Sequence, residues 1–257
     1  MNMPMIGALP EGNNEFALYV EGLTVAFNGF VAVNDLNLYV EKGETRVVIG
    51  PNGAGKTTVL DLICGRTKAN SGSIRFKDIE LTAMSEHQIV RAGVGRKFQT
   101  PSIYETLTVR ENLEVSFPRG RTVLGALAFR LTADVVARVE EVAEQIFLST
   151  HLHRPAELLS HGQKQWLEIG MLLMQAPELM MLDEPVAGMS VSEREKTAEL
   201  LNRIGKDRSM IVIEHDMEFA RHIADKVTVL HQGQVLAEGS MDHVQNDPRV
   251  IEVYLGH

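Results

Sequence analysis

The sequence predicts an α/β fold with a mostly parallel β-sheet. Apolar runs at 45–49, 179–182 and 210–213 have the length of buried strands, and segments with helical periodicity lie between them. Strands that alternate with helices are typical of parallel sheets, because a helix must carry the chain back to the starting edge. A glycine-rich stretch at 50–58 joins the first of these strands to a helical pattern.

That glycine-rich stretch has the pattern G-x-x-x-x-G-K-[ST], the P-loop, in the strand–loop–helix context that the motif requires. Glycines bring backbone N–H groups close to phosphate oxygens, Lys56 can reach the β- and γ-phosphates, and Thr57 can ligate Mg²⁺. The motif predicts a nucleoside triphosphate site but does not distinguish an ATPase from a GTPase or a small-molecule kinase. Its residues are Gly50, Pro51, Asn52, Gly53, Ala54, Gly55, Lys56, Thr57 and Thr58.

An antiparallel layer is expected before the P-loop. Apolar runs at 17–20, 23–27, 30–33 and 36–40 predict four short strands, and Asn28-Gly29 is a strong hairpin-turn dipeptide. A last hairpin is expected around Gln232-Gly233 near the end of the chain.

Helices are predicted from capping residues and from periodicity. Capping-box spacing indicates helix starts at Ser85, Thr108 and Ser192. An amphipathic helix is indicated by apolar residues on one face, namely Val135, Val139, Val142 and Ile146.

These elements predict one domain over 15–257 after a flexible tail at 1–14. A nucleotide-binding core would comprise 15–86 and 166–257. Residues 87–165 are mainly helical in pattern and would form an inserted helical subdomain.

Composition and charge disfavour several classes of function and of structure. Lys and Arg total 25 against 34 Asp and Glu, a net charge of −9, which disfavours nucleic acid as a partner because phosphate backbones need a basic surface. Cys64 is the only cysteine, so no disulfide framework is possible. No apolar run approaches the ~20 residues of a membrane span, and no signal peptide is expected.

Polar residues at strand ends narrow the chemistry. Asp183 ends the apolar run at 179–182 and Glu184 follows it. Phosphoryl transfer with Mg²⁺ needs a carboxylate at the end of a neighbouring strand, and the second acid could polarise water. His215 lies just beyond the strand at 210–213, at the edge where parallel sheets bind ligands. Solvated loop acids are the alternative interpretation, but placement after an apolar strand favours function.

A further candidate is Leu159-Ser160-His161-Gly162-Gln163, at the start of a largely apolar helix. It offers a hydroxyl and free backbone N–H groups for phosphate, although an ordinary serine N-cap has the same spacing. Together with the P-loop, Gln99, Leu182-Asp183-Glu184-Pro185 and His215, it resembles the motif set of ABC-transporter ATPases. The resemblance covers nearly the whole chain from about residue 17.

The resemblance implies ATP and Mg²⁺ as cofactors and a role for each motif. Lys56 and Thr57 would bind phosphate and Mg²⁺, Asp183 would hold the metal shell, and Glu184 would act as general base. Gln99 would sense Mg²⁺ and link to the permease. His215 would contact the γ-phosphate, and Phe27 would stack on adenine.

In that family Ser160, Gly162 and Gln163 would close over the γ-phosphate of a partner's ATP, so that a dimer holds two ATPs. The implied partners are membrane permease subunits, a second ATPase subunit (a copy or a related chain) and, indirectly, a substrate-binding protein. The location would be the cytoplasmic face of the bacterial inner membrane. His161 and Ser190 depart from the usual glycine and aspartate.

Within the family the sequence resembles the branched-chain amino acid type of importer. Segments 95–101, 161–168, 184–189 and 246–256 look most like the ATPase subunit of bacterial urea importers. Alternatives are branched-chain amino acid or short-amide import, or a soluble ABC ATPase acting on DNA, ribosomes or iron–sulfur assembly. A P-loop kinase or GTPase is disfavoured by Ser160-His161-Gly162-Gln163.

Overall fold

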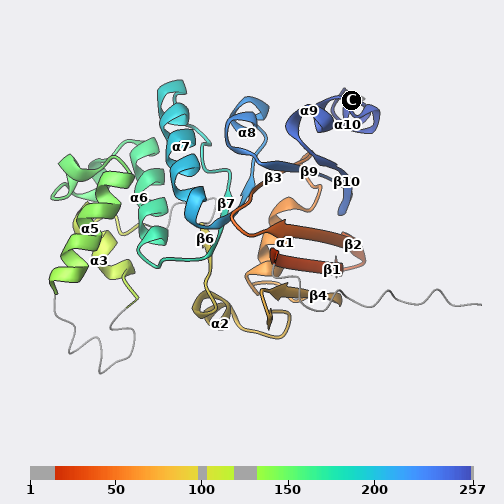
Figure 1. Ribbon diagram of the computed structural model, residues 1–257, viewed down its shortest axis with the longest axis horizontal. Helices are drawn as coiled ribbons and strands as arrows, with labels where there is room; N and C mark the ends of the chain where they lie inside the picture. The colour runs from red at the N-terminus through yellow and green to blue at the C-terminus, as the bar shows by residue number, and fades with distance from the viewer. Residues whose placement is uncertain (1–14, 98–102, 119–131, 256–257) are drawn as a thin grey trace, which may run out of the picture.

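The computed structural model describes residues 15–97, 103–118 and 132–255. It contains a four-stranded antiparallel sheet in the order β2-β1-β4-β5 and a six-stranded sheet in the order β10-β9-β3-β8-β7-β6. In Figure 1 the antiparallel sheet and α1 lie below the six-stranded sheet, α7 and α8 lie above it, and α6, α3 and α5 extend to the left. The α/β prediction with an N-terminal antiparallel layer is therefore confirmed.

Five strands of the central sheet run parallel, and only β10 is antiparallel to its neighbour β9. All residues of β3, β7 and β8 are buried, as expected for a parallel sheet covered on both faces. The strands are β3 (Thr45–Ile49), β6 (Val94–Lys97), β7 (Leu179–Asp183), β8 (Ser209–Ile213), β9 (Lys226–His231) and β10 (Gln234–Gly239).

Alternate residues of β7 enter two separate hydrophobic cores. Met180 and Leu182 pack with the residues of α5, α6 and α7 on one face. Leu179 and Met181 pack with the antiparallel sheet and the helix after the P-loop on the other. Side chains alternate between the faces of a strand, so the central sheet lies between two apolar layers and its strand ends are held rigidly.

The antiparallel sheet has fewer and longer strands than expected. The four predicted strands merge into β1 (Phe16–Phe27) and β2 (Phe30–Glu41), which pair through several register shifts. Gly22 and Asp35, where the runs were divided, have positive φ angles of 58° and 48°, so they are bulges and not chain reversals. The Asn28-Gly29 turn is confirmed, and β4 (Ser71–Phe76) and β5 (Ile79–Glu80) complete the sheet.

The helices begin largely where capping residues predicted. Capping boxes at Ser85 and Thr108 are confirmed, but α7 begins after Ser190, which pairs with Glu193, and not after Ser192. The helices are α1 (Lys56–Ile63), α2 (Glu86–Arg91), α3 (Val109–Ser116), α5 (Ala133–Gln145), α6 (His161–Leu173), α7 (Val191–Ile204), α8 (Met217–Ile223), α9 (Met241–Gln245) and α10 (Pro248–Leu255).

One strand lies where helix was expected. Val94–Lys97 form β6, which pairs in parallel with β7 at the edge of the central sheet, although 87–165 was expected to be mainly helical. The strand is only four residues long and contains Gly95 and two basic residues, so it lacks a strand pattern. Among the described helices, none is long and apolar enough to cross a membrane.

Candidate nucleotide-binding and hydrolysis site

The P-loop joins the end of β3 to the start of α1, as predicted. Gly50, Gly53 and Gly55 have φ angles of 151°, 79° and 98°, and a Cβ at Gly55 would lie 2.6 Å from the carbonyl oxygen of Ala32. Glycine is therefore required for the loop to pass so close to β2. The first turn of α1 has no acidic side chain, so its N–H groups and dipole are available to an anion.

Lys56 folds back over this loop. Its Nζ donates to the carbonyl oxygens of Gly50 and Pro51 at 2.7 and 3.0 Å. Burial lowers the pKa of Lys56, and the negative charges of Glu184 and Asp183 oppose that change. The ammonium group is thus held at the loop by neutral carbonyls. A phosphate could take their place and form a stronger, charge-assisted hydrogen bond with it.

A pocket of about 430 Å³ opens over the loop, and the predicted P-loop residues 52–58 line it. Phe27 and Phe30 stand at its edge, paired across the hairpin, and their side chains are 46% and 67% exposed. Exposed aromatic faces beside a phosphate loop suit stacking on a nucleotide base. Phe27 was predicted for this role. Phe30 was missed, although its place across Asn28-Gly29 could have indicated it.

Asp183 lies at the end of β7 next to the P-loop helix. Its carboxylate accepts a hydrogen bond from the Thr57 hydroxyl, so the two predicted metal-binding residues are adjacent. Burial raises the pKa of Asp183, and the Arg96 guanidinium, 3.5 Å away, opposes that rise. Arg96 also donates to Asp61 of α1 at 2.6 Å. It thereby holds β6, β7 and the P-loop helix together.

These oxygen donors fit Mg²⁺. A hydroxyl and one carboxylate are ligands that this ion prefers, with phosphate oxygens and waters completing its shell. In the described part of the chain no group of three His, Cys, Asp or Glu residues could hold a metal by itself. Thr57 and Asp183 therefore suit an ion that arrives with a nucleotide.

Glu184 belongs to the same pocket, and His215 lies beside it. Glu184 lines the pocket, has a φ of 46° and donates its N–H to Ile213 of β8 at 3.0 Å. Its Oε1 lies 3.8 Å from Nδ1 of His215. A φ in the left-handed region is strained for a residue other than glycine, and such strain is typical of functional sites. The structure thus brings together two residues, each predicted separately at the end of its own strand, β7 and β8.

A buried acid supports both of these segments. Glu214 is completely buried and accepts hydrogen bonds from the N–H groups of Val186 and His215 at 3.4 and 3.2 Å. Burial raises its pKa to about 7, and these N–H donors oppose the rise. Glu214 fixes the backbone beside Glu184 and His215. Sequence reasoning missed it, because nothing in the pattern separates it from a solvated acid after a strand.

The segment Ser160–Gln163 forms the start of α6. Ser160 caps the helix by accepting from Gln163 N–H at 3.2 Å, and the Gln163 side chain accepts from Ser160 N–H at 3.0 Å. His161 Nε2 lies 3.0 Å from the carbonyl oxygen of Ala187. Ser160, Gly162 and Gln163 are not among the described residues that line the P-loop pocket.

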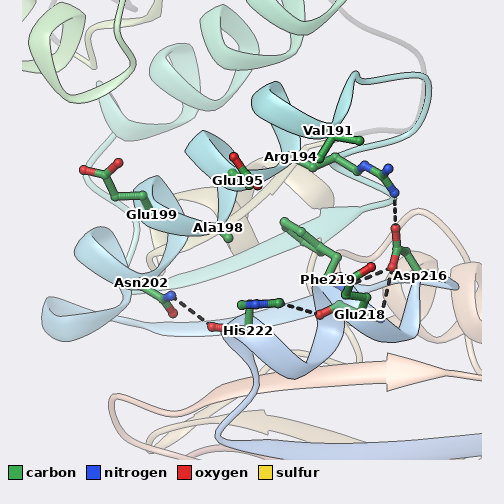
Figure 2. A pocket seen from close by; sticks show the side chains of 10 residues that line it. All are labelled: Val191, Arg194, Glu195, Ala198, Glu199, Asn202, Asp216, Glu218, Phe219 and His222. Carbon is green, nitrogen blue, oxygen red and sulfur yellow. Dashed lines mark hydrogen bonds and ion pairs between the residues drawn. The ribbon is translucent and has the colours of Figure 1, made fainter.

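A second hollow lies between α7 and α8, with a volume of about 380 Å³. Figure 2 shows Arg194 of α7 reaching Asp216 at its edge. Asp216 caps α8 by accepting from Glu218 and Phe219 N–H, and it follows His215 directly. This ion pair therefore attaches the segment that carries His215 to the start of α7.

Gln99 lies outside the described residues, so its predicted contact is not placed. The strand that leads to it is firmly attached, because buried Lys97 at the end of β6 lies 3.2 Å from the Glu168 carboxylate of α6. This ion pair joins β6 to the helix that begins at Ser160.

A family model described as "ABC transporter" matches residues 33–187. The chain belongs to the ABC transporter family. A second model, described as "Branched-chain amino acid ATP-binding cassette transporter", matches residues 234–257 of this ABC ATPase.

Curated relatives agree along nearly the whole length. The chain is 36% identical over 248 residues to the high-affinity branched-chain amino acid transport ATP-binding protein BraF of Pseudomonas aeruginosa, covering 93% of this chain and 97% of that protein. It is 37% identical to LivG of Escherichia coli K12, with the same coverage of 93% and 97%. It is therefore an ABC ATP-binding subunit of the branched-chain amino acid importer type.

Solved structures show the same fold. The crystal structure of the ADP conformation of MJ1267, an ATP-binding cassette of an ABC transporter, is similar with a TM-score of 0.83 and 31% identity, covering 95% of this chain and 99% of that one. A nucleotide-free ATP-binding cassette gives 0.81 and 30% identity, with 95% and 100% covered. The chain thus has the fold of an ATP-binding cassette, and as a member of the ABC ATPase family it couples ATP hydrolysis to transport.

Proposed function

We propose that this ABC ATPase energises an importer through a site that two subunits complete. The observation that carries the proposal is that the residues needed for one ATP site lie apart within a single chain. Glu184 lines the P-loop pocket with His215 3.8 Å from it, whereas Ser160 begins α6 and is not among the described residues lining that pocket. A second subunit that presents its own Ser160 segment would cover the γ-phosphate.

Within that site each residue has one task. Lys56 and the P-loop N–H groups bind phosphate, and Thr57 and Asp183 hold Mg²⁺, which neutralises charge on the phosphates. Glu184 accepts a proton from the attacking water as general base, and His215 contacts the γ-phosphate. Phe27 and Phe30 stack on the base. Ser160, Gly162 and Gln163 act on the partner's ATP, and Gln99 connects the metal shell to the permease.

The proposed partners are two membrane permease subunits and a second ATPase subunit, with a substrate-binding protein acting through the permeases. The chain would then lie at the cytoplasmic face of the membrane. We further propose that the helices of 87–165, without β6, form the subdomain on which a permease docks. The buried Lys97–Glu168 pair supports transmission from that subdomain to β6.

The transported solute is proposed by resemblance. Branched-chain amino acids are the first candidate, because the relatives BraF and LivG are named for them. Urea is the second, favoured by the segments at 161–168 and 184–189 that resemble urea-importer ATPases. The ATPase function of this chain is the same for both solutes.

Uptake separates these candidates. A host that lacks this chain is complemented with wild type or with Glu184→Gln, and uptake of labelled leucine and labelled urea is measured. We expect wild type alone to restore one of the two solutes. Restoration of either solute by Glu184→Gln would contradict the role of hydrolysis, whereas restoration of neither solute by wild type would reject both substrates.

A further inference from the structure

One carboxylate joins two helix starts. Glu193, in the first turn of α7, accepts from the Ser190 N–H and hydroxyl at 2.9 and 2.8 Å. Its other oxygen accepts from the Ser160 hydroxyl at 3.2 Å. Ser190 begins α7 and Ser160 begins α6, so Glu193 is shared by the two N-caps.

The same carboxylate occupies space at the N-terminus of α6. An ideal Cβ on Gly162 would lie 2.3 Å from Oε1 of Glu193. Because glycine has no side chain, there is room for this oxygen. Hydrogen bonds from the Ser190 backbone and hydroxyl lower the pKa of Glu193, so it is an anion at neutral pH. A helix N-terminus attracts an anion, and here the chain supplies one itself.

The Ser160 hydroxyl has only one proton to donate. It gives that proton to Glu193, and its oxygen already accepts from Gln163 N–H. A phosphate oxygen can bind the hydroxyl only as an acceptor. Glu193 and an incoming phosphate therefore require the same proton, and their negative charges repel each other.

We propose that Glu193 is a built-in competitor of the partner's ATP, which must displace its carboxylate from Ser160 before the two-subunit site closes. The inference rests on the proposed contact of Ser160 with the γ-phosphate. Glu193 is then a positioning residue that sets how much ATP is needed for closure. It does not touch the reacting atoms.

Glu193→Gln tests the charge alone. Glutamine keeps the capping box at the start of α7, and it removes the negative charge beside Ser160. The half-saturating ATP concentration for hydrolysis should fall by roughly tenfold, the order of one unit-charge contact at an intermediate dielectric. The maximal rate should change much less, because Glu184 and the P-loop are untouched.

The experiment uses the transporter assembled with its permease and ATPase partners in vesicles, with hydrolysis measured against ATP concentration. Glu195→Gln is the matched control. It removes the same charge from the same helix, but on the side that faces the hollow between α7 and α8 (Figure 2). It should leave the half-saturating ATP concentration unchanged. Glu193→Asp keeps the charge and should not lower half-saturation. The gap between wild type and Glu193→Gln should shrink as salt rises.

An unchanged or raised half-saturation in Glu193→Gln, or an equal fall in Glu193→Asp or Glu195→Gln, would overturn the inference and leave the ATPase intact. Absence of ATP hydrolysis by the wild-type complex would instead reject the proposed function, and the inference with it. Thermal unfolding of each variant shows that the comparison is made between folded proteins.

Discussion

The P-loop and the start of α6 are both helix N-termini, but they present opposite surfaces to an anion. At α1 the first turn has no acidic side chain, and Lys56 lies over the loop. At α6 the carboxylate of Glu193 contacts Ser160 and fills the space beside Gly162. The first site is ready for phosphate within one chain, whereas the second is occupied by the chain's own anion.

The largest expected effect concerns the P-loop side of the site, which includes Glu184 and which one chain supplies by itself. Glu184→Gln should lower ATP hydrolysis by roughly 10²- to 10⁴-fold, because the amide cannot accept the proton of the attacking water. Steady-state phosphate release by the assembled transporter measures it, and ATP binding at the P-loop should persist. Near-normal turnover would remove Glu184 as the base.

Substitution of Arg96 tests how the P-loop side of the site is held together. Arg96→Met leaves buried Asp183 without its guanidinium and should lower the free energy of unfolding by about 3 kcal/mol, as expected when one partner of a buried ion pair is removed. Denaturant unfolding measures this loss. Arg66→Met, on an exposed arginine 4.0 Å from the same Asp61, is the control and should cost less than about 1 kcal/mol. Equal losses in the two variants would contradict the supporting role of Arg96.

Glu214 makes the stability of the P-loop side of the site depend on pH. Its folded pKa of about 7 lies above its ordinary value of 4.5, so the folded state keeps a proton that the unfolded state releases. The contribution to stability is full below pH ~4.5 and is lost as pH rises through ~7, by up to about 3 kcal/mol. Glu214→Gln should remove that part of the decline. Parallel pH profiles of unfolding free energy in the two proteins would refute it.

The smallest expected effects compare the two serine caps. Ser160→Ala and Ser190→Ala should each lower the unfolding free energy by about 1 kcal/mol, the usual cost of an N-cap. Only Ser160→Ala should also weaken the response of hydrolysis to ATP, because only Ser160 is proposed to meet the partner's phosphate. Equal kinetic effects from both caps would remove the distinction between the helices.

Sequence reasoning succeeded where the chemistry is local. The P-loop, Asp183, Glu184 and His215 were placed correctly relative to the strands, because each follows an apolar run that could only be buried. Arg96 was not recognised as a partner of Asp183, because its strand β6 carries no strand pattern and gains its place from pairing with β7. The start of α7 was placed two residues late, since Ser190 and Ser192 both have a glutamate three residues on.

The sequence by itself determined the phosphate loop, the strand-end acids and membership of the ABC family, because these depend on residue types at short spacing. Tertiary structure alone decided that Glu193 contacts Ser160, that Arg96 meets Asp183 and that buried Glu214 accepts from the N–H of Val186. Such contacts join segments that lie tens of residues apart. A carboxylate in a loop has the same pattern whether it faces water or another helix, so only the packed fold separates the two.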